Sequence, residues 1–201
     1  MTETQSPGSR TLSLLRTLNA IGRLSSTSSS DRAIADFVTA SVMEIVGGDG
    51  CALFLYNRDD DLLHLRSAPG FDFDSGFRFS MSTSVGIVGA AARSQTTVNA
   101  PDAPAHPDYF PVEGMGEERY RSQVAAPMIS QDTSELIGVL TVFAREPDEF
   151  GDETVAFLEA IAREATHAIV ASRSRTASDE QLRKKIAELS TLQRVSRVIA
   201  S

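Results

Sequence analysis

Polar and aromatic side chains gather in an irregular stretch near the middle of the chain. His106, Asp108, Tyr109 and Phe110 stand within residues 100–118, a segment rich in proline and glycine. A long irregular segment in a compact domain is uncommon and is often a lid or a binding loop. An imidazole, a carboxylate and two rings could select a small molecule by hydrogen bonding and stacking. We therefore expect residues 100–118, here called the lid segment, to cover a ligand pocket. The alternative is an exposed loop that its aromatic residues tie to the body.

Two arginines follow the lid segment. Arg119 and Arg121 flank Tyr120 at the start of an apolar run. A guanidinium group offers a two-pronged match to a carboxylate or a phosphate, so both arginines are candidates for binding an anionic ligand. Alternatively they pair with Glu117, Glu118 or the aspartates of the lid segment.

A short helix is predicted over residues 85–94. Its Gly86 and Gly89 lower the helix propensity, which indicates that another part of the chain approaches its backbone closely. The free amides of its first turn would suit an anion in the same pocket. Plain helix packing explains the two glycines better than an anion site does.

The remaining reactive side chains give little sign of catalysis. His64 alternates to the polar face of a predicted strand, and His167 lies on a long helix, where we expect it to be solvated or at a dimer interface. The three scattered histidines lack metal-ligand spacing. Cys51 is the single cysteine and lies in the apolar run CALFLY, so we expect a buried, inert thiol. No Ser–His–acid set or phosphate loop is recognisable. The sequence therefore predicts no catalytic residues and no metal, and it names no cofactor.

The spacing of apolar residues predicts the strands and helices that position these side chains. Residues 122–130 and 136–143 read as two strands joined by a polar turn, and both runs are apolar on both faces, so their sheet should be covered on both sides. An earlier pair, residues 51–56 and 62–67, reads as a hairpin. Phe71 to Ser80 could add a short strand, and Thr97 and Val98 another.

Four longer helices are predicted in addition to residues 85–94. They cover Thr11 to Leu24, Ser30 or Asp31 to Gly47, the amphipathic stretch after Gly151 that continues past Ile169, and Ser178 to Ser201. Leu15 to Leu24 resembles Leu189 to Val198, so the last helix could begin a second copy of the domain. We expect a disordered tail over residues 1–10, one domain over 11–173, and a linker helix over 174–201.

Composition narrows the class of protein further. The 201 residues are 41% apolar, enough for one globular core, and the net charge of −8 opposes nucleic acid as a direct partner. No apolar run approaches the ~20 residues of a membrane helix, and the start of the chain lacks the pattern of a signal peptide. We expect a cytoplasmic protein without membrane contact.

Three phrases of the sequence resemble the GAF family: VGIVGAAARSQTTVNAPDAPAHPDYF, GEERYRSQVAAPMIS and LIGVLTVFAREPDEFGDETVAFLEAIA. The likeness spans residues 12–172 and is greatest to the N-terminal GAF domains of nitrogen-branch phosphotransferase enzyme I and of bacterial sensor kinases. It implies an α+β fold, with an antiparallel six-stranded sheet, helices on both faces and long terminal helices. The first, second and last helices would back one face, and a ligand pocket would lie on the other.

The resemblance also implies a function. GAF domains sense small molecules, are usually dimers, and pass the signal through terminal helices to an output domain. The chain has Phe150, Asp152 and Glu153 but lacks the Asn-Lys pair of the cyclic-nucleotide-binding members. Cys51 lies outside the loop that carries the pigment cysteine of bilin-binding members, and one thiol lacks the resolving partner of the free methionine sulfoxide reductases.

We therefore expect a sensory homodimer and not an enzyme. A ligand-free dimerisation and relay module is the alternative. The two chains would meet through an apolar stripe consisting of Leu14, Leu18, Ile21, Val155, Leu158 and Ile169.

Overall fold

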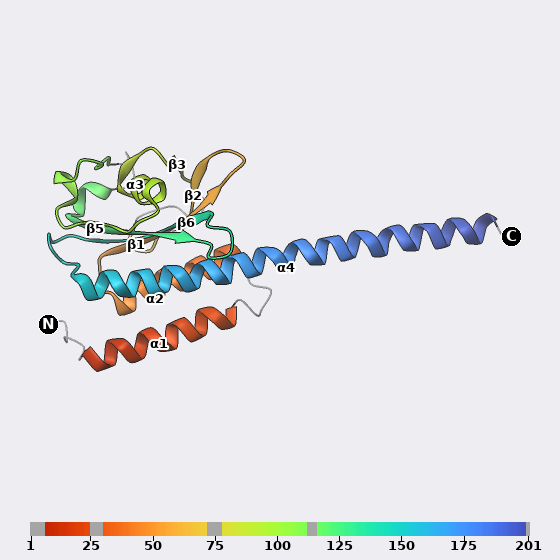
Figure 1. The fold of residues 1–201 in the computed structure, drawn as a ribbon, viewed down its shortest axis with the longest axis horizontal. Coiled ribbons are helices and arrows are strands. Elements are labelled where there is room, and N and C mark those ends of the chain that lie inside the picture. Colours follow the sequence, from red (N-terminus) through yellow and green to blue (C-terminus); the bar gives the residue numbers. More distant parts are fainter. Residues whose placement is uncertain (1–6, 25–29, 72–77, 112–115, 200–201) are drawn as a thin grey trace.

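The protein is described by a computed structural model that covers residues 7–24, 30–71, 78–111 and 116–199 (Figure 1). Six strands form one sheet in the order β3-β2-β1-β6-β5-β4, and every neighbouring pair is antiparallel. The predicted α+β class and six-stranded sheet are therefore confirmed. The strands are β1 (Gly50–Asn57), β2 (Leu62–Ser67), β3 (Ser80–Ser82), β4 (Val98–Ala100), β5 (Ser122–Ile129) and β6 (Leu136–Ala144).

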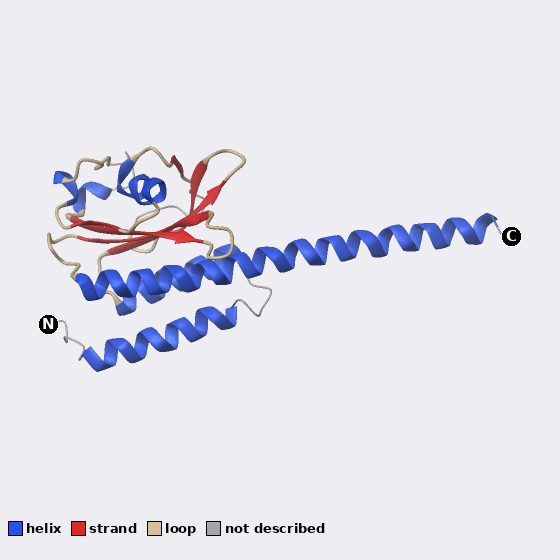
Figure 2. Ribbon diagram, in the orientation of Figure 1, coloured by secondary structure: helices blue, strands red, loops and turns tan. Residues whose placement is uncertain are grey.

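Helices cover both faces of the sheet (Figure 2). α2 (Asp31–Ile45) and α4 (Asp152–Ile199) pack on one face, and α1 (Pro7–Leu24) lies outside them, in contact with both. α3 (Gly86–Ser94) and residues 100–111 and 116–118 of the lid segment lie on the opposite face, while residues 112–115 of that segment are outside the described part of the chain. This two-sided cover explains why β5 and β6 are apolar on both faces.

The sheet separates two apolar cores. The larger core lies between the sheet and α1, α2 and α4, and the smaller one lies beneath α3 and the lid segment. Neighbouring residues of a strand point to opposite faces, so Leu53 enters the larger core and Phe54 the smaller one. The smaller core forms the base on which any ligand pocket of the α3 face must be built.

Most of the predicted boundaries are close to those observed, with three differences. α1 begins at Pro7, earlier than Thr11, and proline is favoured at the first position of a helix. The short strand predicted within Phe71 to Ser80 lies at Ser80–Ser82, while residues 72–77 are outside the described part of the chain. Residues 1–6, most of the predicted tail, are likewise outside it.

The third difference concerns the last two predicted helices, which are one continuous helix, α4. The joining residues contain no glycine or proline. Their hydroxyl groups bond back to the helix: Thr176 Oγ1 donates to the Ser172 carbonyl at 3.1 Å, and Ser178 Oγ donates to the Ser174 carbonyl at 2.9 Å. Nothing in this stretch therefore interrupts the helix, and its distal part projects away from the body (Figure 1).

The predicted dimer stripe is wrong. Leu14, Ile21, Leu158 and Ile169 are buried in the larger core of the same chain, and Leu18 and Val155 pack against that core. These residues join α1 to α2 and α4 and join α4 to the sheet, so they cannot also join two chains. Among the described side chains of the two helices, the large apolar residues that remain exposed are Leu12, Leu15, Leu182 and Ile186.

Among the described residues, no helix has the length and apolar character needed to cross a membrane.

Candidate functional site

A narrow cavity lies under the lid segment on the α3 face of the sheet. Its volume open to a water-sized molecule is about 20 Å³, which is room for about one water. The total empty space between the lining atoms, including the solvent-filled opening, is about 410 Å³. The lining comes from β3, α3, the lid segment, the residues between it and β5, and from β5 and β6: Met81, Gly86, Ile87, Val88, Ala103, Tyr109, Phe110, Glu117, Tyr120, Gln123 and Phe143.

The floor of the cavity is an aromatic cluster. The ring of Tyr120 lies 5.3 Å from that of Phe143, and Phe71 packs edge-on against both. The Tyr120 hydroxyl donates to the Gly70 carbonyl at 2.8 Å. Burial raises the pKa of Tyr120, and its ring is almost fully covered. The floor is therefore rigid and uncharged.

Gln123 supplies a polar group at the floor. Its Nε2 donates to the Thr141 hydroxyl at 3.1 Å, and that hydroxyl donates to the Val124 carbonyl. These bonds fix the Gln123 side chain between β5 and β6. An orienting amide in a mainly apolar pocket is a common way to fix the position of a ligand.

The first turn of α3 forms one wall. Gly86 has a φ of +73°, Val85 stands at the N-cap, and no side chain caps the turn. Gly89 explains the close approach predicted for this helix, because a Cβ there would lie 2.6 Å from the Thr83 carbonyl oxygen. Glycine at residue 89 therefore lets α3 seat tightly on the loop that precedes it.

The lid segment is anchored at its base by Arg121. Its Nη2 donates to Asp102 Oδ1 at 2.9 Å, and its carbonyl accepts from the Ala103 amide at 2.6 Å. Of the two roles considered for Arg121, ligand binding or pairing with an aspartate of the lid segment, the structure shows the pairing. Arg119 turns to the other side of the floor, where its Nη2 donates to the Gly70 carbonyl at 2.6 Å and its guanidinium lies over the Tyr120 ring.

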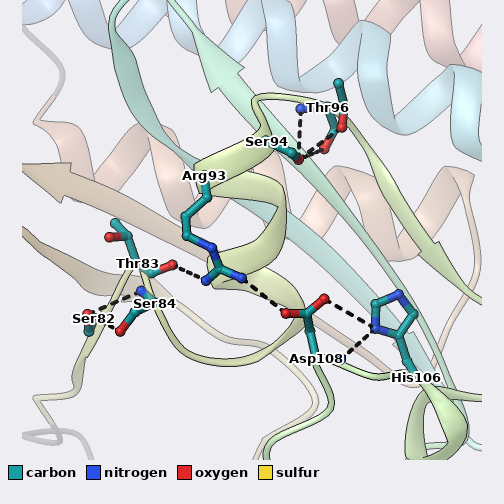
Figure 3. A network of polar contacts seen from close by, with 8 residues as sticks. All are labelled: Ser82, Thr83, Ser84, Arg93, Ser94, Thr96, His106 and Asp108. Carbon is teal, nitrogen blue, oxygen red and sulfur yellow. Dashed lines mark hydrogen bonds and ion pairs between the residues drawn. The ribbon is translucent and has the colours of Figure 1, made fainter.

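A second contact ties the outer part of the lid segment to α3 (Figure 3). Arg93 donates to Asp108 Oδ1 at 3.0 Å and to the Thr83 carbonyl at 2.7 Å, while His106 Nδ1 accepts from the Asp108 amide at 3.2 Å. We call Arg93, Asp108 and His106 the latch. It is partly exposed, so Arg93 and Asp108 can exchange their pairing for water at small cost.

The six predicted site residues thus divide into three groups. Tyr109 and Phe110 line the cavity, His106 and Asp108 form the latch, and Arg119 and Arg121 hold the floor and the base of the lid segment. Sequence reasoning missed Gln123, Glu117 and Arg93. Of these three residues, only Gln123 could have been recognised from the sequence, because it is a lone amide in an apolar strand.

The single thiol lies away from this cavity. Cys51 is fully buried in the larger core, and burial raises the pKa of its thiol. A protonated, inaccessible thiol is a poor nucleophile. Within the described ranges no group of three or more His, Cys, Asp or Glu side chains could hold a metal ion.

Comparison with known families agrees with this architecture. Residues 28–170 match the family model described as GAF domain, so the chain belongs to the GAF family. A search of curated proteins found no match.

Several solved structures share the fold. The GAF domain of a phosphoenolpyruvate-protein phosphotransferase from Coxiella burnetii is 24% identical, with a TM-score of 0.72 over 83% of this chain and 98% of that chain. A putative GAF sensor protein from Burkholderia vietnamiensis is 20% identical, with a TM-score of 0.67 over 82% of this chain and 98% of that one.

An enzyme has the same fold. The free methionine-R-sulfoxide reductase of Neisseria meningitidis, solved with its substrate, is 20% identical, with a TM-score of 0.69 over 87% of this chain and 98% of that chain. At these identities the three similarities establish the fold alone, and the GAF fold includes both sensors and enzymes.

Proposed function

We propose that the chain is a small-molecule-sensing regulatory GAF domain of a larger bacterial signalling protein in the cytoplasm. The observation that carries this proposal is the cavity between the lid segment and the sheet. It has a rigid aromatic floor, one oriented amide and a roof formed by Tyr109 and Phe110. The buried thiol of Cys51 argues against a reductase.

The lining indicates a small ligand with an apolar body. The uncapped first turn of α3 favours an anionic group at that end of the cavity, because helix amides and the helix dipole attract negative charge. Glu117 is the charged side chain among the described lining residues, and it disfavours a second negative charge on the ligand. Arg119 and Arg121 would support the site through Tyr120 and Asp102 rather than by contact with the ligand.

Binding requires the lid segment to move, because the cavity now has room for about one water. Release of Asp108 from Arg93 would free the roof residues Tyr109 and Phe110 from α3. A ligand that prefers the released arrangement shifts the population toward it, and that differential affinity is the physical requirement for a signal. The signal would reach the output domain through the sheet and α4, which packs on β5 and β6.

A ligand screen tests the proposal. Amino acids, 2-oxo acids and nucleotides should be tested by thermal shift and calorimetry, and a true ligand at 100 times its Kd stabilises the fold by about 2.7 kcal/mol. Phe110→Ala should weaken binding, since its ring lines the cavity and is 58% exposed. Phe37→Ala is the matched control, because Phe37 is exposed on α2, away from the cavity. Absence of any ligand, or equal effects of both variants, would contradict sensing at this cavity.

A ligand-free dimerisation and relay module is the second candidate, and the narrowness of the cavity favours it. Both candidates use a homodimer formed by the terminal helices. Leu182 and Ile186 are one helical turn apart on projecting α4 and are 58% and 57% exposed, which suits a partner helix from a second copy.

We expect Leu182→Asp combined with Ile186→Asp to convert a dimer to a monomer in sedimentation equilibrium, because the charges would be buried against each other. Gln181→Asp on the same exposed stretch should leave the dimer intact. A wild-type protein that is monomeric, or a variant that remains dimeric, would disprove this interface.

A further inference from the structure

A serine, a histidine and an aspartate are hydrogen-bonded in series at the edge of the sheet that is formed by β3. Ser80 Oγ lies 2.7 Å from His64 Nδ1, and His64 Nε2 lies 2.8 Å from Asp60 Oδ2. Asp60 lies in the turn between β1 and β2, His64 in β2 and Ser80 in β3. No sequence pattern indicates this set, because Ser80 and His64 meet through the register of the two strands.

The ionised state of the Asp60 carboxylate determines which atoms donate in the two hydrogen bonds of His64. Partial desolvation raises the pKa of Asp60, but hydrogen bonds from His64 and the Leu62 amide outweigh it and leave the pKa below its usual value. An ionised carboxylate only accepts, so His64 carries its proton on Nε2 and donates it to Asp60. Nδ1 of a neutral His64 is then an acceptor, and the Ser80 hydroxyl donates to it.

The three groups are held in place from different sides. Asp60 Oδ1 accepts the Leu62 amide at 3.2 Å, which fixes the carboxylate over its own turn. The side chain of His64 is only 23% exposed, so it is partly buried between the turn and β3 rather than at the surface. Ser80 is exposed, which leaves its Oγ open to a reagent.

The backbone of β3 adds a hydrogen-bond donor beside Ser80. β3 is the outermost strand, and the Leu65 amide donates to the Phe79 carbonyl at 3.0 Å, so Phe79 directs its backbone groups toward β2. Backbone groups alternate along an antiparallel strand, so the Ser80 N–H points to the open edge. An N–H next to the nucleophile is a suitable donor to the oxygen of a group under attack.

We propose that Asp60, His64 and Ser80 form a nucleophilic serine site that accepts an activated acyl or phosphonyl group, separate from the cavity under the lid segment. In acyl transfer, Ser80 Oγ attacks the carbonyl carbon of an ester while His64 Nδ1 takes the hydroxyl proton. The bond to the leaving alcohol then breaks as the imidazolium returns that proton to it, and the acyl group stays on Ser80. Asp60 is a positioning residue that fixes the tautomer of His64.

An alkyl fluorophosphonate tests the site on the intact chain, with the labelled residue located by peptide mass spectrometry. Ser80 Oγ would form a bond to phosphorus, fluoride would leave, and the proton would pass to His64. We expect the labelling rate of Ser80 to fall about 100-fold in His64→Gln and on the order of 10-fold in Asp60→Asn, since a general base contributes at least this much. Ser80→Ala should remove the label.

Ser82 provides the matched control, because its hydroxyl bonds to that of Ser84 at 2.9 Å in place of a histidine (Figure 3). Ser82→Ala should leave the rate unchanged, and Ser82 itself should remain unlabelled. The melting temperature of each variant shows whether the fold is intact. Equal labelling of Ser80 and Ser82, no labelling of Ser80, or an unchanged rate in a folded His64→Gln variant would overturn the proposal.

Discussion

Replacing Leu158 by aspartate is expected to unfold the domain. Leu158 is fully buried in the larger core, on the face of α4 that packs against the sheet and the other helices. A carboxylate there has no partner, and the cost of burying it adds to the lost packing, so we expect a loss of more than about 4 kcal/mol in the free energy of unfolding. Urea unfolding followed by circular dichroism measures this loss.

Ala156→Asp is the control for that experiment. Ala156 is exposed on the same helix, two residues before Leu158, and an aspartate near the start of a helix is well tolerated. Its effect should stay within about 1 kcal/mol. A Leu158→Asp protein that unfolds cooperatively near the wild-type midpoint would show that α4 does not pack on the sheet as described.

Gly138→Ala is expected to produce the second large loss. Gly138 lies in central β6, paired with Leu55 of β1 and Met128 of β5. An added Cβ would collide with the Phe54 carbonyl oxygen, a backbone atom that cannot move without shifting β1. We expect the free energy of unfolding to fall by about 3 kcal/mol, near the upper end for overpacked sites.

The matched control is Gly151→Ala, where the added Cβ would meet no atom within 4 Å beyond its own chain neighbours. Denaturant midpoints of the two variants, measured under the same conditions, should differ clearly. A Gly138→Ala protein as stable as Gly151→Ala would mean that β1 and β6 are not paired in this register.

Local patterns predicted most of the fold. The strands now seen as β5 and β6 could be read from two short apolar runs around a polar turn, and α2 from the capping residue Ser30, whose hydroxyl accepts the Ala33 amide at 3.2 Å. These features depend on residues close in sequence. The continuity of α4 was missed because polar residues in its middle resemble a linker, whereas their hydroxyls bond to the helix itself.

The candidate site was only partly predictable, because its partners are distant in sequence. Tyr109 and Phe110 were found from the composition of the lid segment. The partners of the arginines depend on tertiary structure: Arg119 meets Gly70, and Arg121 meets Asp102. The dimer stripe failed for a related reason, since helical periodicity identifies an apolar face but not whether its partner belongs to the same chain.

The uninterrupted course of α4 has a mechanical consequence. Arg173 is joined to Asp31 of α2 at 2.8 Å, and the helix runs on from there to Ile199 without a further strand or helix of the body beside it in Figure 1. At 1.5 Å per residue, the 26 residues from 174 to 199 act as a lever about 39 Å long. A tilt of the helix by about 5° at Arg173 displaces its far end by roughly 3 Å. Small adjustments in the sheet are thereby magnified with distance.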